Sequence, residues 1–228
     1  MTVETHDGAP LKVRRYSGSA RINHWVTAIT FVLLSISGLA FFHPSLFPLA
    51  IMFGGGEMMR WLHPWLGVVL GISFFMLFIR FLPPNLPEGT DFVWLARIRY
   101  VLAGDEERLP EVGKYNAGQK MVYWSMGFLV PILLITGIGL WEQGRGIVEG
   151  WIGFKSTIDQ QRWAAVIHAG AAILAITIWI THVYAAIWVR GTFSAMTRGN
   201  VSGGWAWRHH RKWLRKEVAT TQAKGKSV

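Results

Sequence analysis

Long apolar runs, separated by polar segments that contain glycine and proline, dominate the pattern along the chain. A helix needs roughly 20 mostly apolar residues to cross the hydrocarbon core of a bilayer. Four runs meet this requirement, at about residues 23–42, 61–80, 120–141 and 163–189. The pattern predicts an all-α integral membrane protein, a four-transmembrane-helix bundle. Its membrane domain covers residues 23–190, between tails of residues 1–22 and 191–228.

The segments between these runs differ in character. Residues 42–61 contain three consecutive glycines and predict an irregular or re-entrant loop. Residues 80–120 are long and polar, and the stretch 91–103 predicts a short amphipathic helix. Residues 142–162 predict a mixed loop. The first apolar run is too long for the core of a cleavable signal peptide, so we interpret it as a membrane helix.

Positive charge is unevenly distributed among the polar segments. The chain has 23 Lys and Arg against 13 Asp and Glu, a formal net charge of +10. Only four basic residues lie in residues 42–61 and 142–162. Because cytoplasmic loops carry the excess of Lys and Arg, we expect both tails and residues 80–120 on the cytoplasmic side of a bacterial inner membrane. The C-terminal tail interleaves tryptophans with basic residues, which predicts a segment along the membrane surface rather than a nucleic-acid site.

The absence of cysteine removes several kinds of redox site. With Cys 0, the chain can hold no disulfide, no thiolate-bound zinc, no iron–sulfur cluster on its own ligands and no covalently attached c-type haem. The 13 Trp and 13 Phe fit aromatic belts at membrane interfaces. A redox role would therefore depend on cofactors held by histidine.

Two histidines share one face of the fourth predicted helix. His168 and His182 are 14 residues apart, which at about 1.5 Å and 100° per residue amounts to about 21 Å along the axis and about 40° short of whole turns. Both imidazoles therefore project from nearly one face, one near each side of the membrane. An ionisable side chain within a span is costly and is by default a candidate for function. This spacing suits two haems stacked within the bundle.

Each haem iron needs a second axial ligand from another helix, and the topology offers one at each level. His24 lies at the cytoplasmic start of the first span, so we pair it with His182 at an inner haem. His63 lies at the outer start of the second span, so we pair it with His168 at an outer, periplasmic haem. Two neutral imidazoles make the iron six-coordinate, which suits electron transfer rather than oxygen binding.

Small residues follow these histidines at same-face offsets. Gly67 and Gly71 follow His63, and alanines follow His168 and His182 at similar offsets, as a flat porphyrin against a helix would require. Small residues also mark ordinary contacts between membrane helices. A single membrane histidine is, moreover, more often a hydrogen-bonded core residue than a metal ligand.

Two other classes of function remain open on the residues alone. Intramembrane histidines relay protons in some transporters, although the four spans contain no carboxylate to share that role. A haem-free anchor that holds soluble subunits at the membrane is the other possibility. The remaining histidines predict no ligand: His43 is expected to be structural, and His6, His209 and His210 are expected to be solvated or lipid-facing.

The polar run before the third span is a candidate ligand site. Asn116 and Gln119 offer neutral hydrogen bonds, and Gly118 lets another group approach the backbone closely. A quinone has two carbonyls that need donors and an apolar tail that needs lipid, so it suits this place at the level of the inner haem. An ordinary helix cap, with Asn116 as the N-cap, explains the same residues equally well.

Several motifs along the chain are recognisable as a set. The most specific is VGKYNAGQKM at residues 112–121. It is supported by Asn23-His24-Trp25, Leu62-His63-Pro64, Ile167-His168-Ala169 with His182, the run AIWVRG at residues 186–191, and residues 207–213 with His209-His210. Over nearly its whole length the chain resembles the cytochrome b556 (gamma) subunits of membrane-bound respiratory formate dehydrogenases.

This resemblance implies the same haem ligands, with His63 and His168 on the outer haem b and His24 and His182 on the inner one. It further implies that His182 joins Asn116, Gly118 and Gln119 around a menaquinone or ubiquinone. The implied partners are an iron–sulfur beta subunit on the periplasmic side and a molybdenum or tungsten alpha subunit, often as a trimer of heterotrimers. Formate oxidation would take place on the alpha subunit, so no catalytic residue for it is expected here. Related cytochromes serve hydrogenases and thiosulfate reductases, so a hydrogenase complex is the alternative donor.

Overall fold

Four long helices form the frame of the molecule. The computed structural model describes residues 3–4, 11–153 and 155–225. The four helices are α1 (Gly18–Phe42), α2 (Gly56–Phe81), α5 (Ala117–Leu140) and α7 (Ile158–Trp188), and each is long and apolar enough to cross a membrane. The predicted fold class is thereby confirmed. Each helix begins three to five residues before the predicted span, because the backbone continues its hydrogen bonding into the polar interface, where hydropathy falls.

The connections contain more regular structure than the pattern predicted. The expected irregular loop after α1 forms the 3-10 helix η1 (Pro44–Phe53), and the expected mixed loop before α7 contains α6 (Glu142–Ile152). The expected amphipathic segment is present as α3 and α4. The remaining elements are β1 (Val3–Glu4), β2 (Lys12–Arg14), η2 (Pro83–Asn85), α3 (Gly89–Ala96), α4 (Ile98–Leu102), η3 (Glu106–Arg108), α8 (Thr192–Thr197), β3 (Asn200–Ser202), α9 (Gly203–His209) and α10 (Arg211–Gly225).

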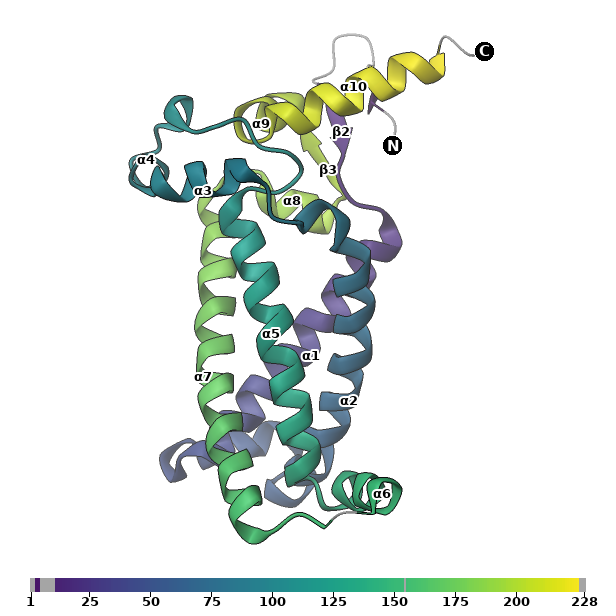
Figure 1. The fold of residues 1–228 in the computed structure, drawn as a ribbon, viewed down its shortest axis with the longest axis vertical. Helices are drawn as coiled ribbons and strands as arrows, with labels where there is room; N and C mark the ends of the chain where they lie inside the picture. The colour runs from purple at the N-terminus through teal and green to yellow at the C-terminus, as the bar shows by residue number, and fades with distance from the viewer. Residues whose placement is uncertain (1–2, 5–10, 154, 226–228) are drawn as a thin grey trace. The chain divides into compact units, whose positions relative to one another are not determined.

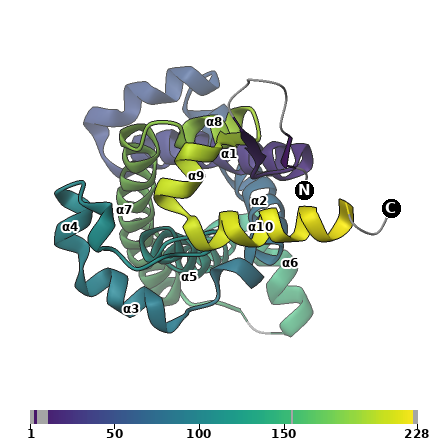
Figure 2. The same ribbon diagram turned by 90° about the horizontal axis from the view of Figure 1, so that it is seen from above.

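The chain divides into two compact units, and the first is a helical bundle made of Asn23–Phe78 and Trp124–Ile180. Within it the four long helices run side by side, as Figure 1 shows along the bundle and Figure 2 shows from above. Every one of these helices contributes to the core, whose buried members are Phe31, Leu70, Leu129, Ala171 and Ala175. The bundle therefore buries a thin apolar centre along its axis.

The outside of the bundle is also apolar. Ile72, Phe75 and Ile135 are 61%, 63% and 71% exposed. Contiguous apolar exposure of this extent marks an interaction site on a soluble protein, and on four spanning helices it is the surface that faces lipid. The chain is thus a multi-pass membrane protein.

Glycines let α2 and α5 approach closely at two places. A Cβ on Gly71 would lie 3.1 Å from the Leu134 side chain, and a Cβ on Gly127 would lie 2.5 Å from the Phe78 ring. The sequence interpretation of Gly71 as room for a porphyrin is therefore wrong in detail, because Leu134 fills that space. A Cβ on Gly67 would meet no atom of the described residues within 4 Å, so the helix face at Gly67 stays open.

The second compact unit, here called the tail unit, consists of Met1–Ile22, Ile79–Tyr123 and Thr181–Val228. It contains a three-stranded antiparallel sheet in the order β1-β2-β3, with Val13 opposite Val201. Strands of two or three residues carry too little periodicity to be predicted, so the all-helical expectation missed this sheet. The sheet joins the N-terminal tail to the C-terminal tail within this unit.

The core of the tail unit is aromatic. Trp205 and Trp213 are 8% and 4% exposed, whereas Trp207 is 49% exposed. Two of the three tail tryptophans are therefore packed inside the unit, and the expectation that the tail lies along the membrane surface stays a prediction. Their partners in the core are Val13, Tyr16, Tyr115, Ala195, Val201, Ala206 and Leu214.

Candidate functional site

Two of the predicted haem ligands lie together inside the bundle. The imidazole rings of His63 on α2 and His168 on α7 have centroids 6.4 Å apart, at an interplanar angle of 63°. An imidazole nitrogen lies about 2 Å from a bound metal, so two rings on opposite sides of one ion have centroids about 6 Å apart. The separation therefore fits a single metal ion shared by these two side chains, as in a haem with two histidine ligands.

A hydroxyl group holds the far nitrogen of each ring. Ser37 Oγ on α1 lies 2.6 Å from His63 Nδ1, and Thr136 Oγ1 on α5 lies 2.9 Å from His168 Nδ1. With Nδ1 engaged in this way, Nε2 is the nitrogen that remains for a metal. Neither hydroxyl was singled out from the sequence, since no local pattern marks which serine or threonine will face a histidine.

The two other predicted ligands occupy different units. His24 lies on α1 in the bundle, where its ring meets the ring of Trp25 edge-on at 5.6 Å. His182 lies on α7 in the part that belongs to the tail unit. Their pairing around an inner haem stays a prediction.

The N-terminus of α5 carries a reciprocal cap. The backbone N–H of Gln119 donates to Asn116 Oδ1 at 2.9 Å, and the backbone N–H of Asn116 donates to Gln119 Oε1 at 3.1 Å. The capping interpretation of these residues is therefore confirmed. The same bonds fix how the amides point, because a backbone N–H can bond only to the amide oxygen. Both side-chain NH2 groups consequently point away from the cap and remain available as hydrogen-bond donors.

The backbone at Gly118 is approached by an aromatic ring of the tail unit. A Cβ on Gly118 would lie 3.2 Å from the Trp94 indole of α3. The close approach expected at Gly118 is thus present, and the group that makes it is a tryptophan of the chain itself. Trp94 and the side-chain amides of Asn116 and Gln119 together form the group of residues at the start of α5 that is here called the corner.

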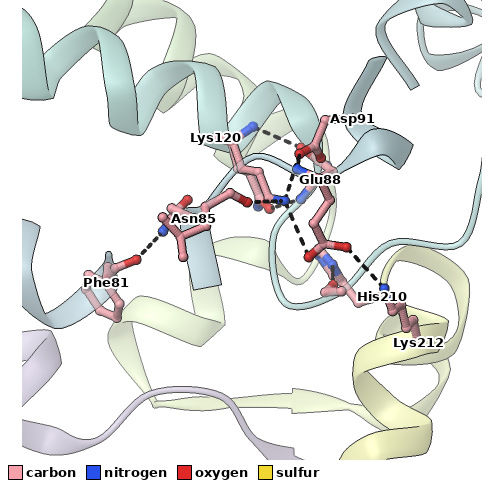
Figure 3. Close-up of polar contacts among 11 residues, drawn as sticks. Phe81, Asn85, Glu88, Asp91, Lys120, His210 and Lys212 are labelled. Carbon is pink, nitrogen blue, oxygen red and sulfur yellow. Dashed lines mark hydrogen bonds and ion pairs between the residues drawn. The ribbon is translucent and has the colours of Figure 1, made fainter. Parts of the chain in front are cut away.

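A buried ion pair, not anticipated from the sequence, holds this corner together. Lys120 Nζ donates to Asp91 Oδ2 at 2.8 Å and to the Leu86 carbonyl at 3.0 Å, and it lies 3.7 Å from Glu88 Oε1. Figure 3 shows Lys120 reaching towards Asp91 and Glu88, with Lys212 on the other oxygen of Glu88. Lys120 and Asp91 are only 6% and 8% exposed. The pair ties the first turn of α5 to α3.

His210 contradicts the expectation that it is solvated or lipid-facing. It is 1% exposed, its Nδ1–H donates to the Gly113 carbonyl at 2.9 Å, and its Nε2 lies 3.3 Å from Nη2 of Arg15. Its neighbour Arg15, also 1% exposed, is surrounded by aromatic rings at 4.9–5.7 Å from its guanidinium carbon. Cation–π attraction is strongest where water is excluded, and here it offsets the burial of a charge that faces no carboxylate among the described residues. The rings belong to Tyr16, Tyr115, Trp205 and Trp213.

The burial of His210 predicts that the tail unit is sensitive to acid. Burial, and the charge of Arg15, lower the pKa of His210 from 6.5 to about 2. Below pH 6.5 the unfolded chain binds a proton at this site that the folded chain does not. The free energy of unfolding should therefore fall by about 1.4 kcal/mol for each pH unit as the pH is lowered from 6.5 towards 2. Hydrogen exchange of the tail-unit amides at several pH values measures how the free energy of unfolding changes with pH. The same change with pH in a His210→Asn variant as in the parent would contradict the role of His210.

His43 and His209 have structural partners. His43 caps η1, where its side chain accepts a hydrogen bond from the Ser45 backbone N–H at 3.2 Å, in agreement with a structural role. His209 was expected to be solvated, but its Nδ1 lies 2.7 Å from Glu106 and its side chain is 18% exposed, so that expectation is also wrong. His6 lies outside the residues that the structure describes.

Comparison with known proteins identifies the family. Residues 15–199 match prokaryotic cytochrome b561. The chain is 38% identical over 207 residues to the cytochrome b556(Fdn) subunit of the nitrate-inducible formate dehydrogenase of Escherichia coli K12, which covers 91% of this chain and 92% of that protein. It is 37% identical over 210 residues to the formate dehydrogenase cytochrome b556(fdo) subunit of the same strain, with coverages of 92% and 95%. The cytochrome b556 subunit of Haemophilus influenzae formate dehydrogenase is 33% identical over 207 residues, with coverages of 91% and 84%.

The family match, over residues 15–199, includes the four spans and both His63 and His168. A protein of this family is a cytochrome b, so haem b is implied, and the arrangement of His63 and His168 fits such a group. The resemblance seen in the motifs is confirmed over about nine tenths of the chain. The chain belongs to the prokaryotic cytochrome b561 family and, within it, to the electron-transferring cytochrome b556 membrane subunits of formate dehydrogenases.

Proposed function

We propose that this subunit holds two haems b and passes electrons across the membrane to a quinone. His63 and His168 hold the outer haem, and His24 and His182 hold the inner one. The supporting observation is the 6.4 Å separation of the His63 and His168 rings, which fits one iron between them. When bound, a haem with two imidazole ligands supplies one-electron chemistry without an open position for oxygen.

The quinone is proposed to bind at the N-terminus of α5. The cap between Asn116 and Gln119 commits both amide oxygens to the backbone and leaves both NH2 groups as donors for quinone carbonyls. Trp94, which is 6% exposed, packs against Gly118 beside them. His182 is proposed to complete the site on the side of the inner haem. The acceptor is menaquinone or ubiquinone, since both present two carbonyls and an apolar tail.

The proposed orientation makes electron transfer build a membrane potential. Both tails and residues 80–120 carry most of the basic residues, so they are proposed to face the cytoplasm. Electrons enter from the periplasmic side, and the protons for quinol come from the cytoplasm. Each charge moved across the bilayer stores about 2.3 kcal/mol per 100 mV.

The electron donor is proposed to be an iron–sulfur subunit of a formate dehydrogenase complex. The curated relatives are named as subunits of formate dehydrogenases. This chain has no cysteine to ligate an iron–sulfur cluster, so the clusters belong to a partner. Formate is oxidised on a further subunit that carries molybdenum or tungsten, and this chain supplies the path to quinone.

An isosteric pair of substitutions tests the quinone site. In the double variant Asn116→Asp with Gln119→Glu, the carboxylate oxygens still cap α5, while both NH2 donors are lost. Quinone reduction by the purified complex should fall by about tenfold for each donor, since one hydrogen bond contributes about 1 kcal/mol and the new charges repel a carbonyl. The haem spectrum should not change.

A matched control exists at another helix start. Gln160 caps α7 in the same manner, with the Thr157 backbone N–H donating to Gln160 Oε1 at 2.8 Å. Gln160→Glu repeats the chemical change there and should leave quinone reduction unaffected. An unchanged rate of quinone reduction in the Asn116 and Gln119 double variant would refute the proposed quinone site.

A further inference from the structure

The hydroxyl groups beside the two bundle histidines each make two kinds of contact. Ser37 Oγ, 2.6 Å from His63 Nδ1, also lies 2.9 Å from the carbonyl of Leu33. Thr136 Oγ1, 2.9 Å from His168 Nδ1, also lies 2.6 Å from the carbonyl of Ile132. Each hydroxyl therefore stands between a helix carbonyl and an imidazole nitrogen.

Counting hydrogens sets the direction of these bonds. A hydroxyl has one hydrogen to donate, and a carbonyl has none. Each hydroxyl can serve its carbonyl and its imidazole together only by donating to the carbonyl and accepting from the imidazole. Nδ1 of His63 and of His168 must then carry the ring hydrogen, which leaves the lone pair of each ring on Nε2.

A glycine follows each hydroxyl residue and brings the ring against the backbone. A Cβ on Gly38 would lie 3.8 Å from Cε1 of His63. A Cβ on Gly137 would lie 3.3 Å from Cε1 of His168, closer than side chains normally pack. The same dipeptide pattern, a hydroxyl residue and then glycine, thus occurs on α1 and on α5 and faces one histidine in each case.

We propose that Ser37-Gly38 and Thr136-Gly137, here called the histidine seats, position His63 and His168 as ligands and lower the midpoint potential of the outer haem. The inference rests on the proposed ligation of that haem by His63 and His168. Hydrogen-bonding the far nitrogen of a metal-bound imidazole fixes its tautomer and raises its basicity. A more basic ligand favours ferric over ferrous iron, so the two seats lower the midpoint potential of the outer haem.

Near-isosteric removal of the hydroxyls tests the seats. Ser37→Ala, Thr136→Val and the double variant should raise the midpoint potential of the outer haem in a spectroscopic redox titration, with the largest shift in the double variant. The inner haem should keep its midpoint and serves as a reference in the same molecule. Selective loss of the outer haem from the double variant would equally support the seats, because the ligands would then have lost their positions.

Control variants separate this effect from a general loss of helix hydrogen bonds. Ser35 and Thr30 donate to helix carbonyls at 2.8 Å and 2.7 Å, as Ser37 does, but they have no histidine partner among the contacts of the described residues. Ser35→Ala and Thr30→Val should leave both midpoints unchanged. The conservative exchanges Ser37→Thr and Thr136→Ser keep a hydroxyl group, so these variants should have the midpoint potential of the parent protein.

Failure of the seats is distinguishable from failure of the ligand assignment. If His63→Ala and His168→Ala each remove one haem while the double hydroxyl variant keeps the parent haem content and both midpoints, the ligands stand and the seats are refuted. If the two histidine variants keep both haems, the proposed ligation itself is refuted.

Discussion

Replacing His63 with alanine is expected to lower the haem content from two haems b per chain to one and to abolish electron transfer to quinone. The ring of His63 lies 6.4 Å from that of His168, so its removal would leave the proposed outer haem with one of its two protein ligands. A pyridine haemochrome assay with quantified protein gives the ratio, and a reduced-minus-oxidised spectrum reports the b-type band that remains. His168→Ala is expected to give the same result, because both rings are proposed to hold the same haem.

His43→Ala is the appropriate control for these variants. His43 is in the segment between the same two helices, α1 and α2, but it caps η1 through Ser45 instead of facing another histidine. It should keep both haems and quinone reduction. Retention of two haems by His63→Ala would contradict the ligand assignment. A parent protein without any b-type band would instead favour a haem-free anchor or a proton-relay transporter.

Breaking the buried pair of Lys120 and Asp91 is expected to produce the largest loss of stability. Lys120→Met leaves the Asp91 carboxylate buried without its partner, which costs about 3–5 kcal/mol in comparable buried pairs. The double variant Lys120→Met with Asp91→Leu should cost much less, because neither charge then remains buried. Thermal unfolding in detergent, followed by hydrogen exchange in residues 86–94, measures both effects.

An exposed pair provides the comparison. Arg162 and Asp159 are 3.1 Å apart with side chains 77% and 82% exposed, so Arg162→Met should change the unfolding free energy little. A Lys120→Met variant as stable as Arg162→Met would show that water reaches the buried pair and that it does not hold α3 against α5.

Residues 112–121 supply several of the contacts within the tail unit. In this segment His210 contacts the Gly113 carbonyl, Asn116 and Gln119 cap the helix, and Lys120 anchors α3. Within a few residues, this segment therefore makes a buried histidine contact, a helix cap and a buried ion pair. The proposed quinone donors are therefore held by a rigid backbone.

Local features of the chain could be predicted because their physics is local. Apolar run length predicted the four spans, and Asn116 before the third span predicted the cap that its Oδ1 makes with the Gln119 N–H. Where a feature depended on neighbours, prediction failed: Gly71 was assigned to a porphyrin but packs on Leu134. Small residues at helical spacing look alike in both settings, and only the facing helix distinguishes them.

The sequence by itself determined the membrane class and the four spans, since hydropathy and helix geometry follow from neighbouring residues alone, and it offered the histidines that are proposed as ligands. The tertiary structure decided which side chains meet across helices. Ser37 reaches His63 over 26 residues, Thr136 reaches His168 over 32, and Arg15 reaches His210 over 195. These contacts depend on how helices and tails pack and on which face each presents. A pattern read along one segment carries no information about its distant partner.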